Sequence, residues 1–153
     1  MAHDARTIAN VFLELGSRDG AHISPLKMQK LIYLANGWSL VMRGPRLVEN
    51  NFEAWPYGPV VPELYNTLSK YGAASITAPI AGFGQQVDGE SKAFIDLIWK
   101  HYCQFSGVQL SALTHEPGYA WDLTIKNASP FKLGRPVISN ELIADEFQRR
   151  AKK

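Results

Sequence analysis

Apolar side chains recur every three or four residues over most of the chain, and this spacing predicts a mainly α-helical fold. We expect a compact single domain, residues 1–153, of about six or seven helices with a short β-hairpin near residues 46–55. The stretches with helical spacing are residues 4–15, 25–42, 62–70, 88–102, 106–113, a short piece from 117, and 139–147.

The second of these helices carries the clearest signals. Ser24 is a favoured N-cap, Pro25 suits the first helical position, and Gly44-Pro45 ends the run. Its apolar face consists of Met28, Leu31, Ile32, Ala35, Trp38 and Met42. The polar residues Lys27, Lys30 and Asn36 lie off that face. The pattern predicts a central buried helix.

The other helices have weaker boundary signals. Expected starts are Asp4, Asp88 or Ser91, the capping box formed by Ser106 and Gln109, Pro117, and Ser139, while Gly16 is expected to end the first helix. Inward positions of the third and fourth helices are Leu64, Tyr65, Leu68, Phe94, Leu97, Ile98 and Tyr102. Residues 75–89 and the segment with Pro130, Gly134 and Pro136 read as loops, the first of them mobile.

Between the second and third helices the pattern becomes extended. Residues 47–48 and 52–55, which are apolar except for Glu53, are separated by Asn50-Asn51, which favours a two-stranded hairpin. It is followed by a rigid corner, residues 55–65, with three prolines, one glycine and three aromatic side chains. Such a corner packs into a core more often than it binds a partner, but aromatic rings held by a rigid turn also suit a binding surface.

Composition narrows the class of protein. The chain has 153 residues, of which 46% are hydrophobic and 20% charged, as in an ordinary globular domain. The single cysteine, Cys103, indicates a reducing compartment. With no apolar leader and no apolar run long enough for a membrane span, we expect a cytoplasmic protein that does not contact membranes.

Three stretches together resemble the SocA-like antitoxin family known as the Panacea domain. The first is Leu26-Lys27-Met28-Gln29-Lys30-Leu31-Ile32-Tyr33 with Gly37-Trp38 after it, the second is residues 52–65, and the third is Leu113-Thr114-His115 with Trp121. Glu141-Leu142-Ile143 matches the last helix of the family. The similarity runs from about Thr7 to Phe147. Pro56 departs from it, because a lysine or another polar residue is commoner there.

This resemblance implies a mostly helical domain that neutralises a toxin by binding it directly. The partner would be a cognate toxin protein encoded by a neighbouring gene. Members of the family are linked to chemically diverse toxins, so the resemblance does not identify the target. An alternative is an adaptor that delivers the bound toxin to a protease.

An enzyme is a weaker hypothesis. Ser111 and His115 lie four residues apart and would share one helix face, but no GxSxG elbow or third catalytic group accompanies them. A hydrolase or nucleotide-binding enzyme using His115 stays open as a less favoured alternative. The four histidines show no metal-ligand spacing, and no phosphate-binding loop is present, so we predict no catalytic residue, no metal and no cofactor.

Protein binding is the best-supported chemistry. The net charge of +2 is small for a nucleic-acid-binding protein, which makes nucleic acid an unlikely partner. Protein interfaces, by contrast, are enriched in tyrosine, tryptophan and arginine. The candidate partner-binding residues are Lys30, Tyr33, Trp55, Tyr57, Tyr65, His115 and Trp121. We expect Lys30 at the edge of this surface, where it could pair with an acidic group of the partner. The alternative is that Trp55, Tyr65 and Trp121 pack inward and only Tyr57 reaches solvent.

Overall fold

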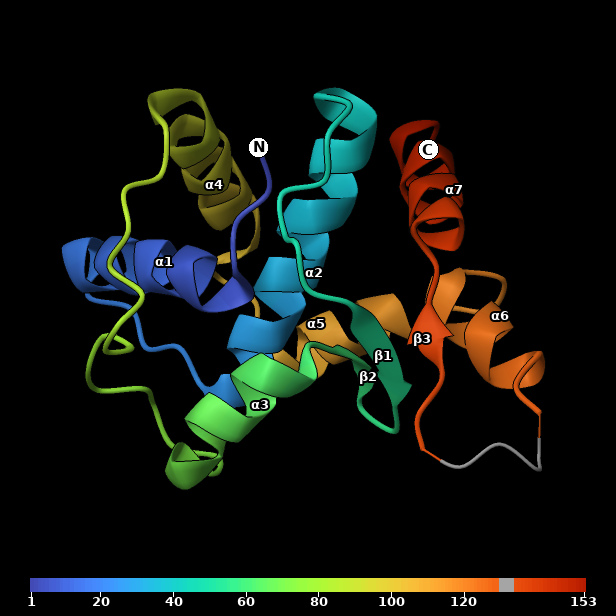
Figure 1. The fold of residues 1–153 in the computed structure, drawn as a ribbon, viewed down its shortest axis with the longest axis horizontal. Coiled ribbons are helices and arrows are strands. Elements are labelled where there is room, and N and C mark those ends of the chain that lie inside the picture. The colour runs from blue at the N-terminus through green and yellow to red at the C-terminus, as the bar shows by residue number, and fades with distance from the viewer. Residues whose placement is uncertain (130–133) are drawn as a thin grey trace.

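The long helix α2 (Pro25–Met42) lies at the centre of the computed structural model, with other helices packed around it (Figure 1). The structure describes residues 1–129 and 134–153. Helices packed against α2 are α1 (Ala5–Asp19), α3 (Pro62–Leu68), α4 (Gly89–Tyr102), α5 (Gly107–Thr114) and α7 (Asn140–Ala151). Helix α6 (Ala120–Lys126) packs against α7, and the 3₁₀ turn η1 (Ser69–Tyr71) follows α3. The predicted mainly α-helical fold is confirmed, with seven α-helices among the described residues.

Helix α2 is buried on more sides than its apolar face alone predicts. Lys27, Lys30 and Asn36, which lie off that face, are all buried. Met42, expected to face inward, is 59% exposed, because it lies in the last turn. The buried polar residues are tolerated because each has a hydrogen-bond partner. Asn36 Oδ1, for example, accepts from the backbone N–H groups of Leu47 and Val48.

A small antiparallel sheet lies beside the lower part of α2 in Figure 1. Its strands are β1 (Phe52–Trp55), β2 (Gly58–Val60) and β3 (Val137–Ile138), in the order β2-β1-β3. The hairpin predicted near residues 46–55 is therefore displaced along the chain. Val48 instead forms a parallel bridge with His3, since the N–H groups of residues 47 and 48 are occupied by Asn36. The sequence pattern did not predict β3.

The two faces of β1 have different environments. Phe52 and Ala54 point into the core, whereas Glu53 and Trp55 are half-buried on the opposite face. Val137 pairs with Glu53 in the register and is 51% exposed. The outer face of this sheet therefore presents Trp55 and Val137 near solvent.

Several helix ends differ from those predicted. Helix α1 continues through Gly16 and ends at Gly20, whose φ of 64° is a left-handed conformation that glycine adopts readily. Helix α6 begins at Ala120 rather than Pro117. On α4, Leu97 is half exposed and Trp99, which the pattern did not single out, is fully buried.

Other local predictions are confirmed. Asp88 caps α4, the capping box of Ser106 and Gln109 starts α5, and Ser139 caps α7. Residues 75–88 lack regular structure, as predicted, and Asn10 bonds two of them: its side chain contacts the backbone N–H and C=O of Ile80 and the C=O of Phe83. Pro130 lies outside the described residues. Among those described, no helix is long and apolar enough to cross a membrane.

Candidate functional site

The turn that joins β1 to β2 brings most of the candidate partner-binding residues together. Four backbone carbonyl groups of this turn accept hydrogen bonds from side chains of α2, α5, α6 and the residue that caps α5. The pairs, carbonyl first, are Trp55 with Trp121 Nε1 (2.7 Å), Pro56 with His115 Nε2 (2.9 Å), Tyr57 with Ser111 Oγ (2.7 Å) and Pro59 with Lys30 Nζ (2.8 Å). We call this set of bonds the turn clamp.

Gly58 shows how closely the clamp surrounds the chain. Its φ is 111°, a region that side chains other than glycine rarely adopt. A Cβ atom at this position would lie 2.7 Å from Thr114 Oγ1 and 3.2 Å from Lys30 Nζ. Both the backbone conformation and the lack of space therefore require glycine at the end of the turn.

Lys30 belongs to the interior and not to a surface. Its side chain is completely buried, its Nζ donates to Pro59 O, and burial lowers its pKa to about 7. The expectation that Lys30 lies at the edge of an exposed surface, free to pair with an acidic group of a partner, is therefore wrong. Sequence spacing placed it off the apolar face of α2, but β2 covers that side of the helix.

We expect the buried Lys30 to make stability increase with pH. Its pKa is about 7 in the folded protein and 10.5 in an unfolded chain, so the unfolded state binds more protons between these values. The free energy of unfolding should rise by about 2–3 kcal/mol between about pH 7 and about pH 9. Urea denaturation across this range measures the rise.

The Lys30→Met variant is the control for this prediction. Burial also lowers the pKa of Lys27, which adds a rise of the same sign, and raises that of Tyr33, which acts oppositely above pH 10. Most of the rise should therefore disappear in Lys30→Met. Parallel pH curves for this variant and the unchanged protein would contradict the prediction.

Tyr33 is also an interior residue. Its ring is fully buried at 5.2 Å from the ring of Phe52, and its hydroxyl donates to Glu146 Oε1 at 2.7 Å. Burial, followed by the nearby carboxylate of Glu146, raises the pKa of Tyr33 well above its ordinary value. Tyr33 can therefore influence a partner only through the packing of α2 on β1 and α7.

Three of the candidate rings reach the surface. Tyr57, at the tip of the turn, is 71% exposed, and Tyr65, which the pattern placed inward, is 46% exposed. The rings of Trp55 and Tyr65 are 4.8 Å apart, and the guanidinium of Arg135 lies 4.8 Å from the centre of the Trp55 ring. With the neighbouring Val137, these side chains form what we call the aromatic surface: Trp55, Tyr57, Tyr65, Arg135 and Val137.

Sequence reasoning missed Arg135 and Val137. Nothing in their local pattern distinguishes them. Val137 pairs with Glu53 and Arg135 lies against Trp55 only because β3 adds to the sheet about eighty residues after β1 along the chain.

His115 and Trp121 lie side by side and bond adjacent carbonyl groups of the turn. Their rings are 4.1 Å apart and both are half-buried. Ser111 and His115 share one side of α5, as predicted, but His115 Nδ1 lies 2.7 Å from the backbone carbonyl of Ser111. Ser111 Oγ donates to Tyr57 O. Ser111 and His115 therefore do not form with each other the hydroxyl–imidazole hydrogen bond that activates a serine nucleophile.

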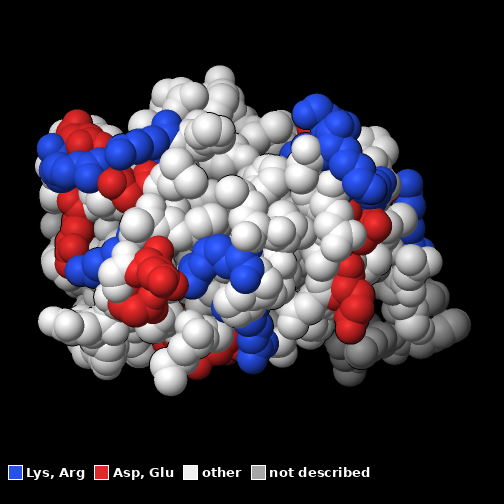
Figure 2. Space-filling model, turned by 90° about the horizontal axis from the view of Figure 1, so that it is seen from above, with Lys and Arg blue, Asp and Glu red and all other residues white. Residues whose placement is uncertain are grey.

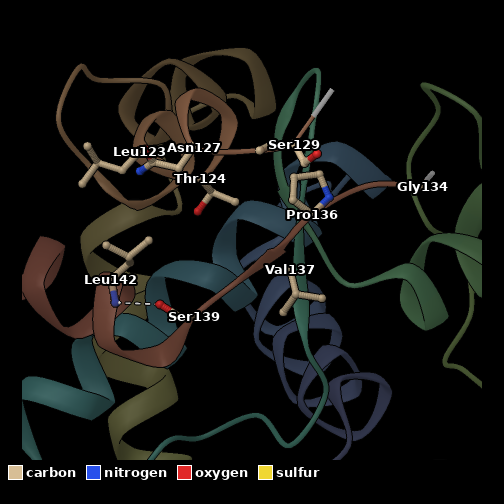
Figure 3. A pocket seen from close by; sticks show the side chains of 10 residues that line it. Leu123, Thr124, Asn127, Ser129, Gly134, Pro136, Val137, Ser139 and Leu142 are labelled. Carbon is tan, nitrogen blue, oxygen red and sulfur yellow. Dashed lines mark hydrogen bonds between the residues drawn. The ribbon is translucent and has the colours of Figure 1, made fainter. Parts of the chain in front are cut away.

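Two hollows lie elsewhere. One, of about 450 Å³, lies between α6, β3 and the start of α7 (Figure 3). Two of its polar side chains are occupied: Thr124 Oγ1 donates to Ala120 O, and Ser139 Oγ accepts from Leu142 N as the cap of α7, the bond drawn in Figure 3. A second, of about 730 Å³, separates α1 from residues 75–79. Within residues 1–129 and 134–153, no group of three histidine, cysteine or acidic residues could hold a metal ion.

The charged residues are mixed in sign on the face shown in Figure 2. Lysine and arginine side chains lie beside acidic ones at both ends of this face, and much of its middle is uncharged. Phosphate backbones bind to continuous basic surfaces, because affinity grows with the number of phosphates neutralised. This face offers no such surface.

Comparison with known proteins agrees with the resemblance found in the sequence. Residues 28–122 match the family model described as "Antitoxin SocA-like, Panacea domain". The chain is 33% identical to Antitoxin SocA of Caulobacter vibrioides over 156 aligned positions, which cover 95% of this chain and 82% of that protein. No solved structure matches the chain. The matched region contains all four side chains of the turn clamp. This protein therefore belongs to the SocA-like Panacea family of antitoxins.

Proposed function

We propose that this protein neutralises a cognate toxin, encoded by a neighbouring gene, by binding it directly through the aromatic surface. Membership of an antitoxin family supports the antitoxin role. The observation that supports this surface most is Tyr57, which is 71% exposed on a turn whose carbonyl groups are fixed by the clamp. An exposed ring on a rigid turn loses little conformational entropy when it is buried by a partner.

The neighbours of Tyr57 suit a protein interface. Trp55 and Tyr65 supply apolar area, and Arg135 supplies a planar cation beside it. Tryptophan, tyrosine and arginine contribute most of the energy in many interfaces because they bury large areas and still make hydrogen bonds. The surface therefore has the composition expected at the centre of a docking site.

Co-expression with the product of each neighbouring gene tests the proposal. The expected result is that one product stops growth when expressed alone, and that this protein restores growth and co-purifies with that product. If no neighbouring product is both toxic and rescued, the proposed function fails. Rescue without co-purification would exclude stable direct binding.

We expect Tyr57→Ala to weaken toxin binding about ten- to thirty-fold, the usual effect of truncating a central interface tyrosine. The melting temperature should change little, because the exposed ring packs on few neighbours. Isothermal titration calorimetry with the co-purifying product measures the affinity.

Leu97→Ala is the matched control for Tyr57→Ala. Leu97 is 49% exposed on α4, which lies on the other side of α2 from the hairpin (Figure 1). Its removal should leave the affinity unchanged. Equal losses in both variants, or none in Tyr57→Ala, would move the docking site away from this turn.

Two alternatives give different outcomes in the same cells. An adaptor that delivers the toxin to a protease would shorten the half-life of the toxin in the cytoplasm, whereas sequestration leaves its amount constant. An enzyme using His115 would lose turnover in a folded His115→Ala variant. We favour a non-enzymatic role because His115 and Ser111 direct their polar side-chain atoms at backbone carbonyl groups.

A further inference from the structure

The ring of His115 lies between two hydrogen-bond acceptors. Its Nδ1 is 2.7 Å from the carbonyl oxygen of Ser111, and its Nε2 is 2.9 Å from the carbonyl oxygen of Pro56. Carbonyl oxygens only accept hydrogen bonds. Both ring nitrogens must therefore carry a hydrogen for both contacts to be favourable.

A neutral imidazole cannot meet this requirement. It has one N–H group and one nitrogen lone pair, and that lone pair would face a carbonyl oxygen here. The protonated ring has two N–H groups and satisfies both carbonyls. Two further features favour a positive charge on this ring: His115 is the C-cap of α5, where the helix dipole is negative, and its ring centre lies 4.1 Å from that of Trp121, with the two rings tilted by 52°.

We propose that His115 is a positioning residue of the aromatic surface, and that its protonated, two-donor form ties Pro56 to the end of α5 and so fixes Tyr57 for partner binding. This inference rests on the proposed function, since it concerns the same surface. Loss of the proton at higher pH removes one of the two bonds and leaves a repulsive contact. The turn then becomes less ordered, and binding through Tyr57 weakens.

The effect of His115 on the turn must be distinguished from that of charged groups on neighbouring elements. Glu116 follows it in the chain, and Arg150 of α7 donates to Leu113 O at the end of α5. On α6, Asp122 accepts from Gly118 N and pairs with Lys126. On α2, Lys30 holds Pro59 in the same turn, and with a pKa of about 7 it is also a titrating group beside this turn.

Nuclear magnetic resonance of the ¹⁵N-labelled full chain, without any partner, tests the role of His115 directly. Long-range ¹H–¹⁵N spectra report which ring nitrogens carry hydrogens from about pH 5.5 to about pH 9, the range in which histidine protonation is normally observed. We expect both nitrogens of His115 to be protonated at the lower end. The backbone amides of Tyr57 and Gly58 should shift as one of these protons is lost.

Two substitutions show which side chain causes the pH-dependent shift of these amides. In Lys30→Met, which removes the titration of Lys30, the pH-dependent shift of the Tyr57 and Gly58 amides should remain, and adding His115→Gln to this variant should abolish it. The inference is overturned if the His115 ring carries one proton throughout. It is also overturned if the turn amides titrate unchanged in His115→Gln.

Binding experiments separate this inference from the proposed function. Affinity for the co-purifying gene product should be about five-fold weaker at about pH 8.5 than at about pH 6.5, the effect of losing one net hydrogen bond. Lys30→Met should keep this dependence on pH, whereas the affinity of the double variant Lys30→Met/His115→Gln should not change with pH. Binding that is tight but independent of pH refutes the role of His115 alone, whereas no binding by any neighbouring product at either pH refutes the proposed function.

Discussion

Replacing Glu146 with alanine is expected to lower the free energy of unfolding by about 3–5 kcal/mol, the cost of removing one partner of a buried ion pair. Glu146 is fully buried on α7. Its Oε1 accepts from Tyr33 Oη (2.7 Å) and Ala120 N (3.2 Å), and its Oε2 accepts from Arg150 Nε (2.8 Å). Alanine would leave all three donors without this acceptor. Chemical denaturation followed by circular dichroism measures the loss.

Variants at and beside Glu146 distinguish the buried network from a general effect on α7. Glu146→Gln keeps an oxygen acceptor and should cost less than alanine. Asp145→Ala removes an exposed pair with Arg149 on the same helix and should cost under about 1 kcal/mol. A loss of similar size in Asp145→Ala and Glu146→Ala would show that helix propensity, and not the buried carboxylate, explains the effect.

The second large effect concerns Phe147, whose ring joins α7 to α2. Its truncation to alanine should cost about 3–5 kcal/mol, as for other buried aromatic side chains. The ring is fully buried, 5.7 Å from the ring of Tyr33 and 5.2 Å from that of Trp38. It lies over Gly37, where an added Cβ would come within 2.1 Å of Phe147 Cε2.

Because of this contact, the effect of Gly37→Ala on the free energy of unfolding should change sign when Phe147 is replaced by alanine. With Phe147 present, Gly37→Ala should destabilise by about 1–3 kcal/mol, because crowding of a packed core outweighs the better helix propensity of alanine. With Phe147→Ala, the same Gly37→Ala substitution should stabilise by up to about 1 kcal/mol. Gly89→Ala is the control, since a Cβ there has no neighbour within 4 Å. Equal effects of Gly37→Ala in both backgrounds would contradict this packing.

The turn clamp connects the stretches that resemble the antitoxin family. Lys30, Ser111 and His115, and Trp121 come from three separate parts of the sequence, yet all bond carbonyl groups of one turn. Much of the resemblance therefore lies in residues that hold this turn, while Tyr57 at its tip and Tyr65 beyond β2 are exposed.

Local sequence determined the helices and most of their starts. Ser24, Ser106 and Ser139 cap helices through bonds to N–H groups three residues away, so their effect depends on nothing distant. The helical spacing of residues 25–42 likewise predicted α2. The aromatic corner was recognised from its own residues, although whether its rings were exposed was left open.

Tertiary structure decided which side chains bond distant backbone groups and which strands pair with each other. Spacing treats a polar residue as outward-facing, but Lys30 and Asn36 are buried because they bond backbone that lies against α2. Strand β1 pairs with β2 and β3, whereas the N–H groups of residues 47 and 48 bond the side chain of Asn36. These choices depend on the geometry of the whole chain, and a periodic pattern, which reports only neighbours along one element, does not contain them.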